Sequence, residues 1–203
     1  TASWSFNAES IQVPLSLLQS QLPGAPEIAG QADIILHIEG QDTRPESGVM
    51  KVDITDSNIT LKLADETQQS IPLSGSFIEL QLQSGILNGM AEIPAINQNF
   101  KPITAHIEIS GYEDFSVLPV DLPLSGGLVA GGNDLSLLSI ISPELQSLEG
   151  SFDIDVNIAG TMQEPQILGK AEISDASYEF LDLGIGITDI NLLGTNTPDY
   201  EYE

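Results

Sequence analysis

Apolar and polar residues alternate with a period of two along much of the chain. In the clearest run, 151–158, the odd positions are polar and the even positions are Phe152, Ile154, Val156 and Ile158. Alternation of this length predicts a half-buried β-strand. The same pattern predicts strands at 32–39, 49–55, 58–63, 77–83, 86–93, 103–110, 166–174, 177–183 and 186–193. One apolar face per strand is typical of antiparallel sheets with one side in water, so we expect an all-β fold.

Turn-forming residues separate most of these runs. Asp56-Ser57-Asn58, Ser84-Gly85 and Ser110-Gly111 predict turns, and Asn88-Gly89 predicts either a turn or a bulge inside a strand. The glycine-rich segment 126–132 predicts a hinge or a long loop. Because β patterning resumes beyond that segment, we interpret 1–203 as a single β-rich unit.

Two short helices are expected beside the strands. Residues 15–22 carry apolar side chains at helical spacing, and Pro23-Gly24 would stop that helix. The second helix is expected from Asp134 to about Leu148, with a kink or restart at Pro143. Its apolar stripe suits a partner-binding helix or, more simply, packing against the core or over one end of the sheet.

The sequence contains an internal repeat at a separation of about 120 residues. The segments 30–57 and 150–177 align, and each opens with a strand that lies between two glycines. Pro45 and Pro165 follow at the same place, in what we expect to be a short loop before the next strand. Recurrence of this unit favours modules that are stacked along one extended sheet.

Composition excludes several classes of function. Five Lys plus Arg against thirty Asp plus Glu leave a net charge of −25, which repels nucleic acid and anionic membrane surfaces. The absence of cysteine excludes disulfides and thiolate metal sites. No apolar run reaches the ~18 residues of a membrane span, and no signal peptide opens the chain. We expect the chain to be part of a longer protein whose anchor lies elsewhere.

No arrangement of residues predicts catalysis, a metal or a cofactor. His37 and His106 are both expected on outward faces of strands. Asp53, Asp56 and Asn58 lack the glycine and terminal glutamate of a calcium loop, so capping of a turn is the better interpretation. We therefore expect that the protein is not an enzyme.

The positive feature is the apolar face itself. Its expected lining residues are aliphatic with one aromatic: Ile34, Leu36, Ile38, Leu61, Leu63, Ile107, Ile109, Phe152, Ile154, Val156 and Ile158. Such faces can close on each other as an ordinary core, which the residues alone favour. They can also stay open as a dry lane for acyl chains, since burial stabilises each methylene by ~0.8 kcal/mol.

A resemblance to a known family favours the open lane. The order Gly150–Gly160, Thr161, Pro165 and Gly169, followed by the pattern of 181–190, resembles the C-terminal region of the TamB family within the AsmA-like group. The match is best over 133–193 and weaker over 4–57. The strong acidity of this chain departs from the family.

The resemblance implies a fold and a setting. It implies an elongated, mainly antiparallel sheet curled into a trough with an apolar interior, in a periplasmic protein anchored in the inner membrane. It implies phospholipid transport between the membranes, and assembly of autotransporters and other outer-membrane proteins with the outer-membrane barrel TamA. Phospholipid acyl chains and unfolded outer-membrane proteins would be the other partners. The alternative is a scaffold that templates β-strands of partner proteins and conducts no lipid.

Overall fold

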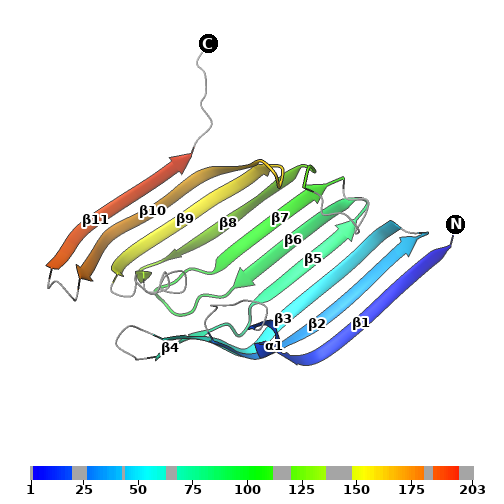
Figure 1. The fold of residues 1–203 in the computed structure, drawn as a ribbon, viewed down its shortest axis with the longest axis horizontal. Coiled ribbons are helices and arrows are strands. Elements are labelled where there is room, and N and C mark those ends of the chain that lie inside the picture. Colours follow the sequence, from blue (N-terminus) through cyan, green and yellow to red (C-terminus); the bar gives the residue numbers. More distant parts are fainter. Residues whose placement is uncertain are drawn as a thin grey trace, which may run out of the picture.

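The chain forms one open antiparallel β-sheet. The computed structural model describes residues 2–19, 27–42, 44–62, 68–111, 120–135, 148–180 and 185–196 (Figure 1). The strands are β1 (Ser3–Pro14), β2 (Glu27–Gln41), β3 (Arg44–Lys62), β4 (Gln68–Pro72), β5 (Phe77–Gln83), β6 (Ile86–Ile93), β7 (Ile103–Ser110), β8 (Leu124–Gly132), β9 (Leu148–Gly160), β10 (Pro165–Phe180) and β11 (Ile185–Asn196). Their order in the sheet follows the sequence, except that β4 pairs with β3 off the main path.

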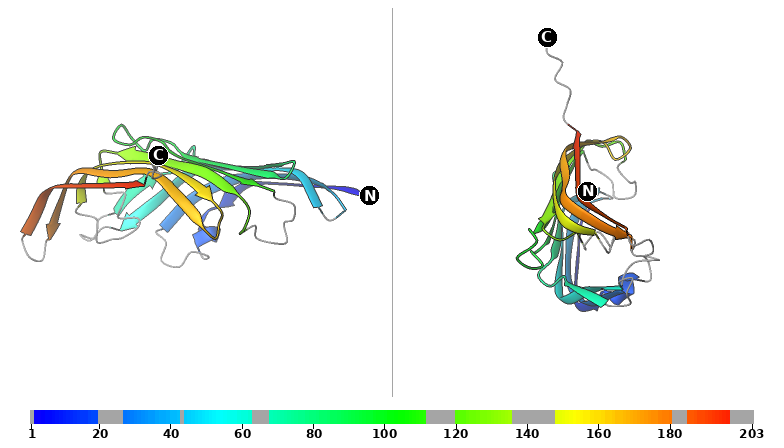
Figure 2. Two further views of the ribbon diagram at one scale, coloured as in Figure 1. Left: turned by 90° about the horizontal axis from the view of Figure 1, so that it is seen from above. Right: turned by 90° about the vertical axis from the view of Figure 1, so that its left-hand side faces the viewer.

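The sheet curls lengthwise into an open trough (Figure 2). Viewed along the longest axis, its cross-section is curved, and β4 and the short helix α1 (Ser16–Gln19) fold over at one margin. The predicted all-β, elongated and mainly antiparallel fold is therefore confirmed. In the part of the chain that the structure describes, no helix has the length and apolar character needed to cross a membrane.

Predicted breaks between strands are bends inside longer strands. Asp56-Ser57-Asn58 lies within β3, which joins the predicted strands 49–55 and 58–63. Residues 47–53 of β3 pair with β5, whereas 58–62 pair with β4, so the strand changes partner at this point. The turn prediction is wrong because Asp56, with a φ of 46°, occupies a β-bulge, which uses the same residue types as a turn. A bulge at Asp175 likewise joins the predicted strands 166–174 and 177–183 into β10.

The two repeated units contain the same bend. In each, a glycine with positive φ, Gly30 (118°) or Gly150 (129°), lies across from the bulge on the next strand. A β-carbon at Gly30 would overlap Ser57, and one at Gly150 would lie 2.7 Å from Cα of Ala176. Ser57 and Ala176 are both buried. The repeat in the sequence therefore marks a bend that needs glycine on one strand and a small residue on the other.

The prolines of the two units lie in strands rather than in loops. Pro45 is near the beginning of β3 and is paired with Gly40, and Pro165 begins β10 and is paired with Gly160. The first positions of a strand tolerate proline because they can lack a ladder hydrogen bond. The predicted loop is therefore shorter than expected.

The bend in the first unit encloses a small core at one margin of the trough. Its buried apolar side chains are Leu15, Ala32, Ile71 and Leu73. The amide of Leu15 donates to the carbonyl of Gly30 (3.0 Å), and the amide of Leu73 donates to the carbonyl of Ser57 (2.8 Å). These contacts tie the ends of β1 and β4 to the bend, so this margin is closed by protein.

The glycine-rich segment 126–132 is a strand and not a hinge or loop, because it forms most of β8. A β-carbon at Gly127 would lie 2.7 Å from the ring of His106, and one at Gly132 would lie 2.5 Å from the ring of Phe100. Close neighbours, rather than backbone freedom, therefore account for glycine here.

The pair Asn88-Gly89 is regular strand for a similar reason. It lies inside β6, and the pairing of β6 with β5 and β7 runs through it without a shift in register. A β-carbon at Gly89 would lie 2.6 Å from Ile107 and 2.9 Å from Leu80. The prediction of a turn or bulge there is wrong, because the glycine makes room for two large side chains.

The structure tests the two predicted helices only in part. The helix expected at 15–22 is α1, Ser16–Gln19, and its expected stop at 23–24 lies outside the described residues. Most of the second helix, 136–147, also lies outside the described residues. Leu148 begins β9, so the expected end of that helix is wrong.

Substitution of either bend glycine tests the repeat. Gly30→Ala and Gly150→Ala should each lower the free energy of unfolding by at least about 2 kcal/mol, because both place a β-carbon in a strained and occupied position. Gly186→Ala is the matched control, since nothing lies within 4 Å of its β-carbon. Urea unfolding followed by circular dichroism measures the difference. Equal stability of all three variants would contradict the assignment of the bend.

Candidate functional site

One face of the sheet is almost entirely apolar from β2 to β10. Because every strand pairs antiparallel, residues directly opposite each other share a face. One row of paired residues crosses nine strands: Ser10, Ile34, Val52, Ile78, Ala91, Ala105, Leu128, Val156 and Gly169. The next row is Ala8, Leu36, Met50, Leu80, Gly89, Ile107, Gly126, Ile158 and Ile167. The alternation of each strand is therefore kept in phase with that of its neighbours.

The structure places the predicted lining residues together on this face, which we call the trough face. They are Ile34, Leu36, Ile38, Ile107, Ile109, Phe152, Ile154, Val156 and Ile158. Leu63 and the side chain of Leu61 lie outside what the structure describes.

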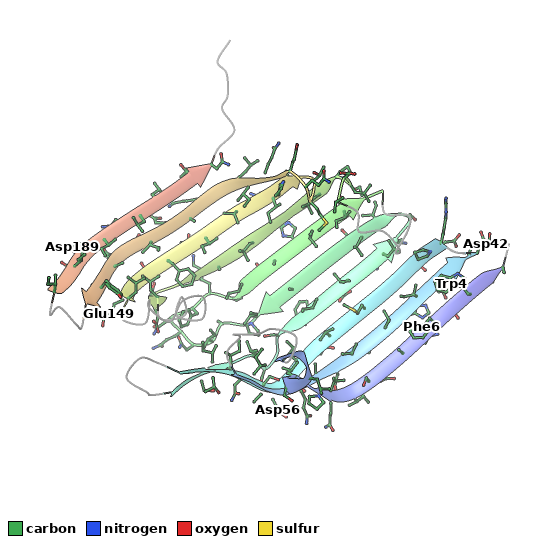
Figure 3. All side chains as sticks on the ribbon, viewed as in Figure 1. Trp4, Phe6, Asp42, Asp56, Glu149 and Asp189 are labelled. Carbon is green, nitrogen blue, oxygen red and sulfur yellow. The ribbon has the colours of Figure 1, made fainter. Side chains whose placement is uncertain are left out.

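Sequence reasoning missed part of the trough face. Trp4, Phe6 and Ala8 extend it onto β1, where their alternation was visible in the sequence (Figure 3). Leu124 and Leu128 extend it onto β8, where intervening glycines on both faces conceal the alternation. Period-two spacing over 4–8 would have found β1, whereas 126–132 is nonpolar at every position, so no alternation marks β8.

The trough face is only partly covered. On the middle strands Leu82, Ile109, Leu124 and Ala130 are buried, whereas Ile78 and Ile107 are 41% and 37% exposed. Toward the ends the exposed fractions rise to 53% for Phe6, 53% for Ile167 and 57% for Leu192. The chain exposes 13273 Å² in all, against roughly 9200 Å² for a compact monomer of this mass. A sheet closed on itself as an ordinary core would expose far less.

A depression lies where the trough face crosses β9, β10 and β11. Its volume is about 270 Å³, and Ala171 and Gly194 form a low floor between larger side chains. The larger lining residues are Phe152, Ile154, Ile173 and Leu192, together with one charged residue, Glu172. The size and lining suit an apolar chain rather than a polar ligand, because the hydrophobic lining offers few hydrogen-bonding groups.

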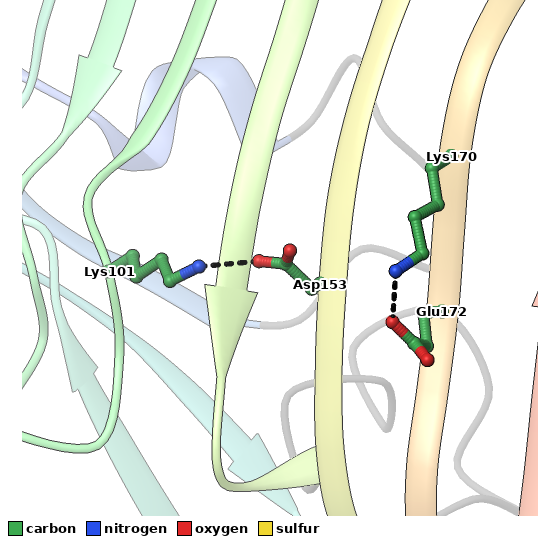
Figure 4. Close-up of polar contacts among 4 residues, drawn as sticks. All are labelled: Lys101, Asp153, Lys170 and Glu172. Carbon is green, nitrogen blue, oxygen red and sulfur yellow. Dashed lines mark hydrogen bonds and ion pairs between the residues drawn. The ribbon is translucent and has the colours of Figure 1, made fainter.

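The opposite face, which we call the polar face, carries the charges of the strands. Lys51 pairs with Glu79 (3.0 Å), and Lys101, from the loop before β7, pairs with Asp153 (2.6 Å; Figure 4). The hydrogen bond that Lys51 donates to Glu79, together with the charge of that carboxylate, raises the pKa of Lys51 above its usual range. Lys170 pairs with Glu172, which raises the pKa of Lys170 in the same way. These exposed pairs contribute little to stability.

Carboxylates nevertheless dominate the polar face. Asp33 lies directly opposite Asp53, and Asp153 lies directly opposite Glu172. Asp42 and Glu149 lie at strand ends, and Asp56 and Asp189 lie at bulges inside β3 and β11 (Figure 3). This charge keeps the polar face hydrated and repels other negatively charged surfaces.

The histidines are where the sequence placed them, on the polar face. His37 contacts Asn7 and Glu39, and His106 lies beside Gly127. Among the residues that the structure describes, no group of three or more histidines and carboxylates is positioned to hold a metal ion. The apolar and partly exposed trough face is the candidate site.

Comparison with known proteins finds no match for this chain among family models, curated proteins or solved structures. The site must be interpreted from its own residues.

The excess of carboxylates predicts a dependence of stability on salt. Raising the NaCl concentration from about 0.02 M to about 0.5 M should raise the melting temperature, because screening weakens repulsion between the unpaired acids. Asp33→Asn, which removes one of two directly opposed carboxylates, should raise the melting temperature at low salt and reduce this dependence. Thermal melts at several salt concentrations provide the measurement, and a fall in melting temperature with salt would refute the expectation.

Proposed function

We propose that this chain binds the acyl chains of phospholipids on its trough face and conducts them along the sheet. The observation that carries the proposal is the unbroken apolar face, in register across the sheet and exposed toward its ends. An apolar surface of this extent on a soluble protein marks a site for a ligand or a partner. A curved sheet lets the acyl chains leave water while the headgroup remains outside.

The energetics favour an aliphatic occupant. Each methylene group that moves from water into the trough contributes ~0.8 kcal/mol, so a long acyl chain is several kcal/mol more stable in the trough than in water. The side chains that meet it are mainly aliphatic, as at Ile34, Leu36 and Ile154, and no strongly polar group interrupts these rows. A path of similar residues lets a chain slide without a deep local minimum.

The resemblance of 133–193 to the TamB family supports a particular setting for this activity. In that setting the chain belongs to a periplasmic protein anchored in the inner membrane and works with the outer-membrane barrel TamA. It carries phospholipid between the two membranes and assists the assembly of autotransporters and other outer-membrane proteins. The acidic polar face is compatible with an extended sheet that stays soluble in an aqueous compartment.

Photocrosslinking tests contact with lipid. Crosslinkers at Ile154 and Ile107 should capture phospholipid in cells, because both positions lie on the trough face. Crosslinkers at Asp155 and Glu108 are matched controls, since these neighbours point to the polar face. Mass spectrometry of the adducts identifies the lipid. Capture at the control positions alone would exclude the trough as the binding surface.

A charge introduced on the trough face distinguishes an open trough from a closed core. Val156→Asp should lower the free energy of unfolding by about 1–3 kcal/mol and leave the chain folded, because Val156 is only partly buried. Asn157→Asp adds the same charge to the polar face and should leave lipid binding unchanged. Thermal melts and binding of a fluorescent phospholipid measure both effects. A folded Val156→Asp variant with normal lipid binding would contradict the proposal.

A further inference from the structure

The depression in the trough face is a short groove with a wall along one side. Two rows of directly opposed residues cross β9, β10 and β11 there: Ile154, Ala171 and Gly194 in one row, and Phe152, Ile173 and Leu192 in the other. The first row is low at Ala171 and Gly194, whereas every residue of the second row is large. The low row forms the floor of the groove, and the large row forms its wall.

The groove is closed at β9 and low at β11. On β9 the floor row rises again at Ile154, beside Phe152 of the wall. On β11 a β-carbon at Gly194 would meet only the carbonyl oxygen of Ala171, at 3.7 Å. An elongated occupant therefore crosses β11 and β10 and ends against β9. This direction is the one along which the proposed conduction runs.

The floor offers an occupant no hydrogen bond. Ala171 is paired with Ile154 on one side and with Gly194 on the other, so the backbone groups of β10 serve the two ladders. Glu172, a charged residue of the lining, pairs with Lys170 (Figure 4). A peptide in the groove would have to bury its own amides and carbonyls without partners, which is unfavourable. An acyl chain has no such groups, so a hydrocarbon is the better occupant.

The volume of the depression limits how much of an acyl chain it can hold. An apolar cavity of about 150 Å³ holds a benzene ring, which has six carbon atoms. The 270 Å³ of the depression therefore suits roughly ten carbon atoms. This is enough for the end of one acyl chain, and the rest of the lipid, including its headgroup, stays outside.

We propose that the depression is a subsite for the terminal part of one phospholipid acyl chain, with its methyl end against Phe152 and Ile154. The inference rests on the proposed function and adds to it a place where a moving chain pauses. The lining comes entirely from β9, β10 and β11. A further strand beside β11 would pair with its outer edge, in the plane of the sheet, and would leave this face as it is.

A photoreactive lipid locates the subsite. Vesicles of phosphatidylcholine that carry a diazirine at the methyl end of one acyl chain are mixed with the protein and illuminated. Mass spectrometry of proteolytic peptides should place most adducts at the large lining residues: Phe152, Ile154, Ile173 and Leu192. The matched probe carries the diazirine beside the ester, and its adducts should lie outside the depression.

Filling the floor provides a second measurement. Gly194→Leu should keep the fold, because the space beside its β-carbon is open. It should lower the yield of methyl-end adducts at Phe152 and Ile154 at least about fivefold, because leucine occupies the place of the chain. Gly186→Leu is the matched control in the same strand, since nothing lies within 4 Å of its β-carbon. Circular dichroism checks the fold, and lipid capture by a crosslinker at Ile107 should persist in both variants.

The outcomes separate this inference from the proposed function. Methyl-end adducts spread evenly over the trough face, or unchanged by Gly194→Leu, would overturn the subsite and leave lipid conduction in place. If neither probe formed adducts anywhere on the trough face, both proposals would fail. Capture of a protein segment instead of lipid by a crosslinker at Ile173 would assign the depression to a partner protein and overturn the inference.

Discussion

The pairing register between neighbouring strands is the constraint on which this molecule depends. Each strand presents a new face at every residue, so a shift of one residue between two strands would move a whole apolar set to the other side. The pairings from β2 to β10 hold Ile34, Val52, Val156 and their counterparts in one row across eight strands of the sheet. Both faces, the apolar interior and the acidic exterior, follow from this single alignment.

Curvature has to be introduced without losing that alignment. The bulges near Asp56 and Asp175 introduce this curvature. Each adds an extra residue to one strand, and the partner strand bends at Gly30 or Gly150. Beyond the first bulge, β3 leaves β5 and pairs with β4, which closes one margin with a small core. Protein therefore fills a corner of the trough, and its two ends remain exposed.

The sequence was most informative in segments where apolar and charged residues alternate one by one. The bounds of β5 and β6 could be read from the alternation alone, because polar residues such as Glu79 and Glu92 mark the outer face. It was least informative at glycine and aspartate, because both serve turns and bulges. Asp56 was misassigned because a turn and a bulge use the same residue types. The glycines of β8 were misassigned because the side chains that fill the space beside them, such as His106 and Phe100, are distant in the sequence. Whether an apolar face is filled by protein also depends on the whole chain, so no single strand could predict it.

The order of the strands in space has a consequence for how the sheet is built. Successive strands on the main path are neighbours in both sequence and structure, so each new hairpin can dock on the one made before it. Such a sheet can assemble progressively from one end as the polypeptide emerges, without waiting for a distant segment to return. Its stability then resembles that of a linear array, in which each strand depends on its two neighbours and opening begins at the ends.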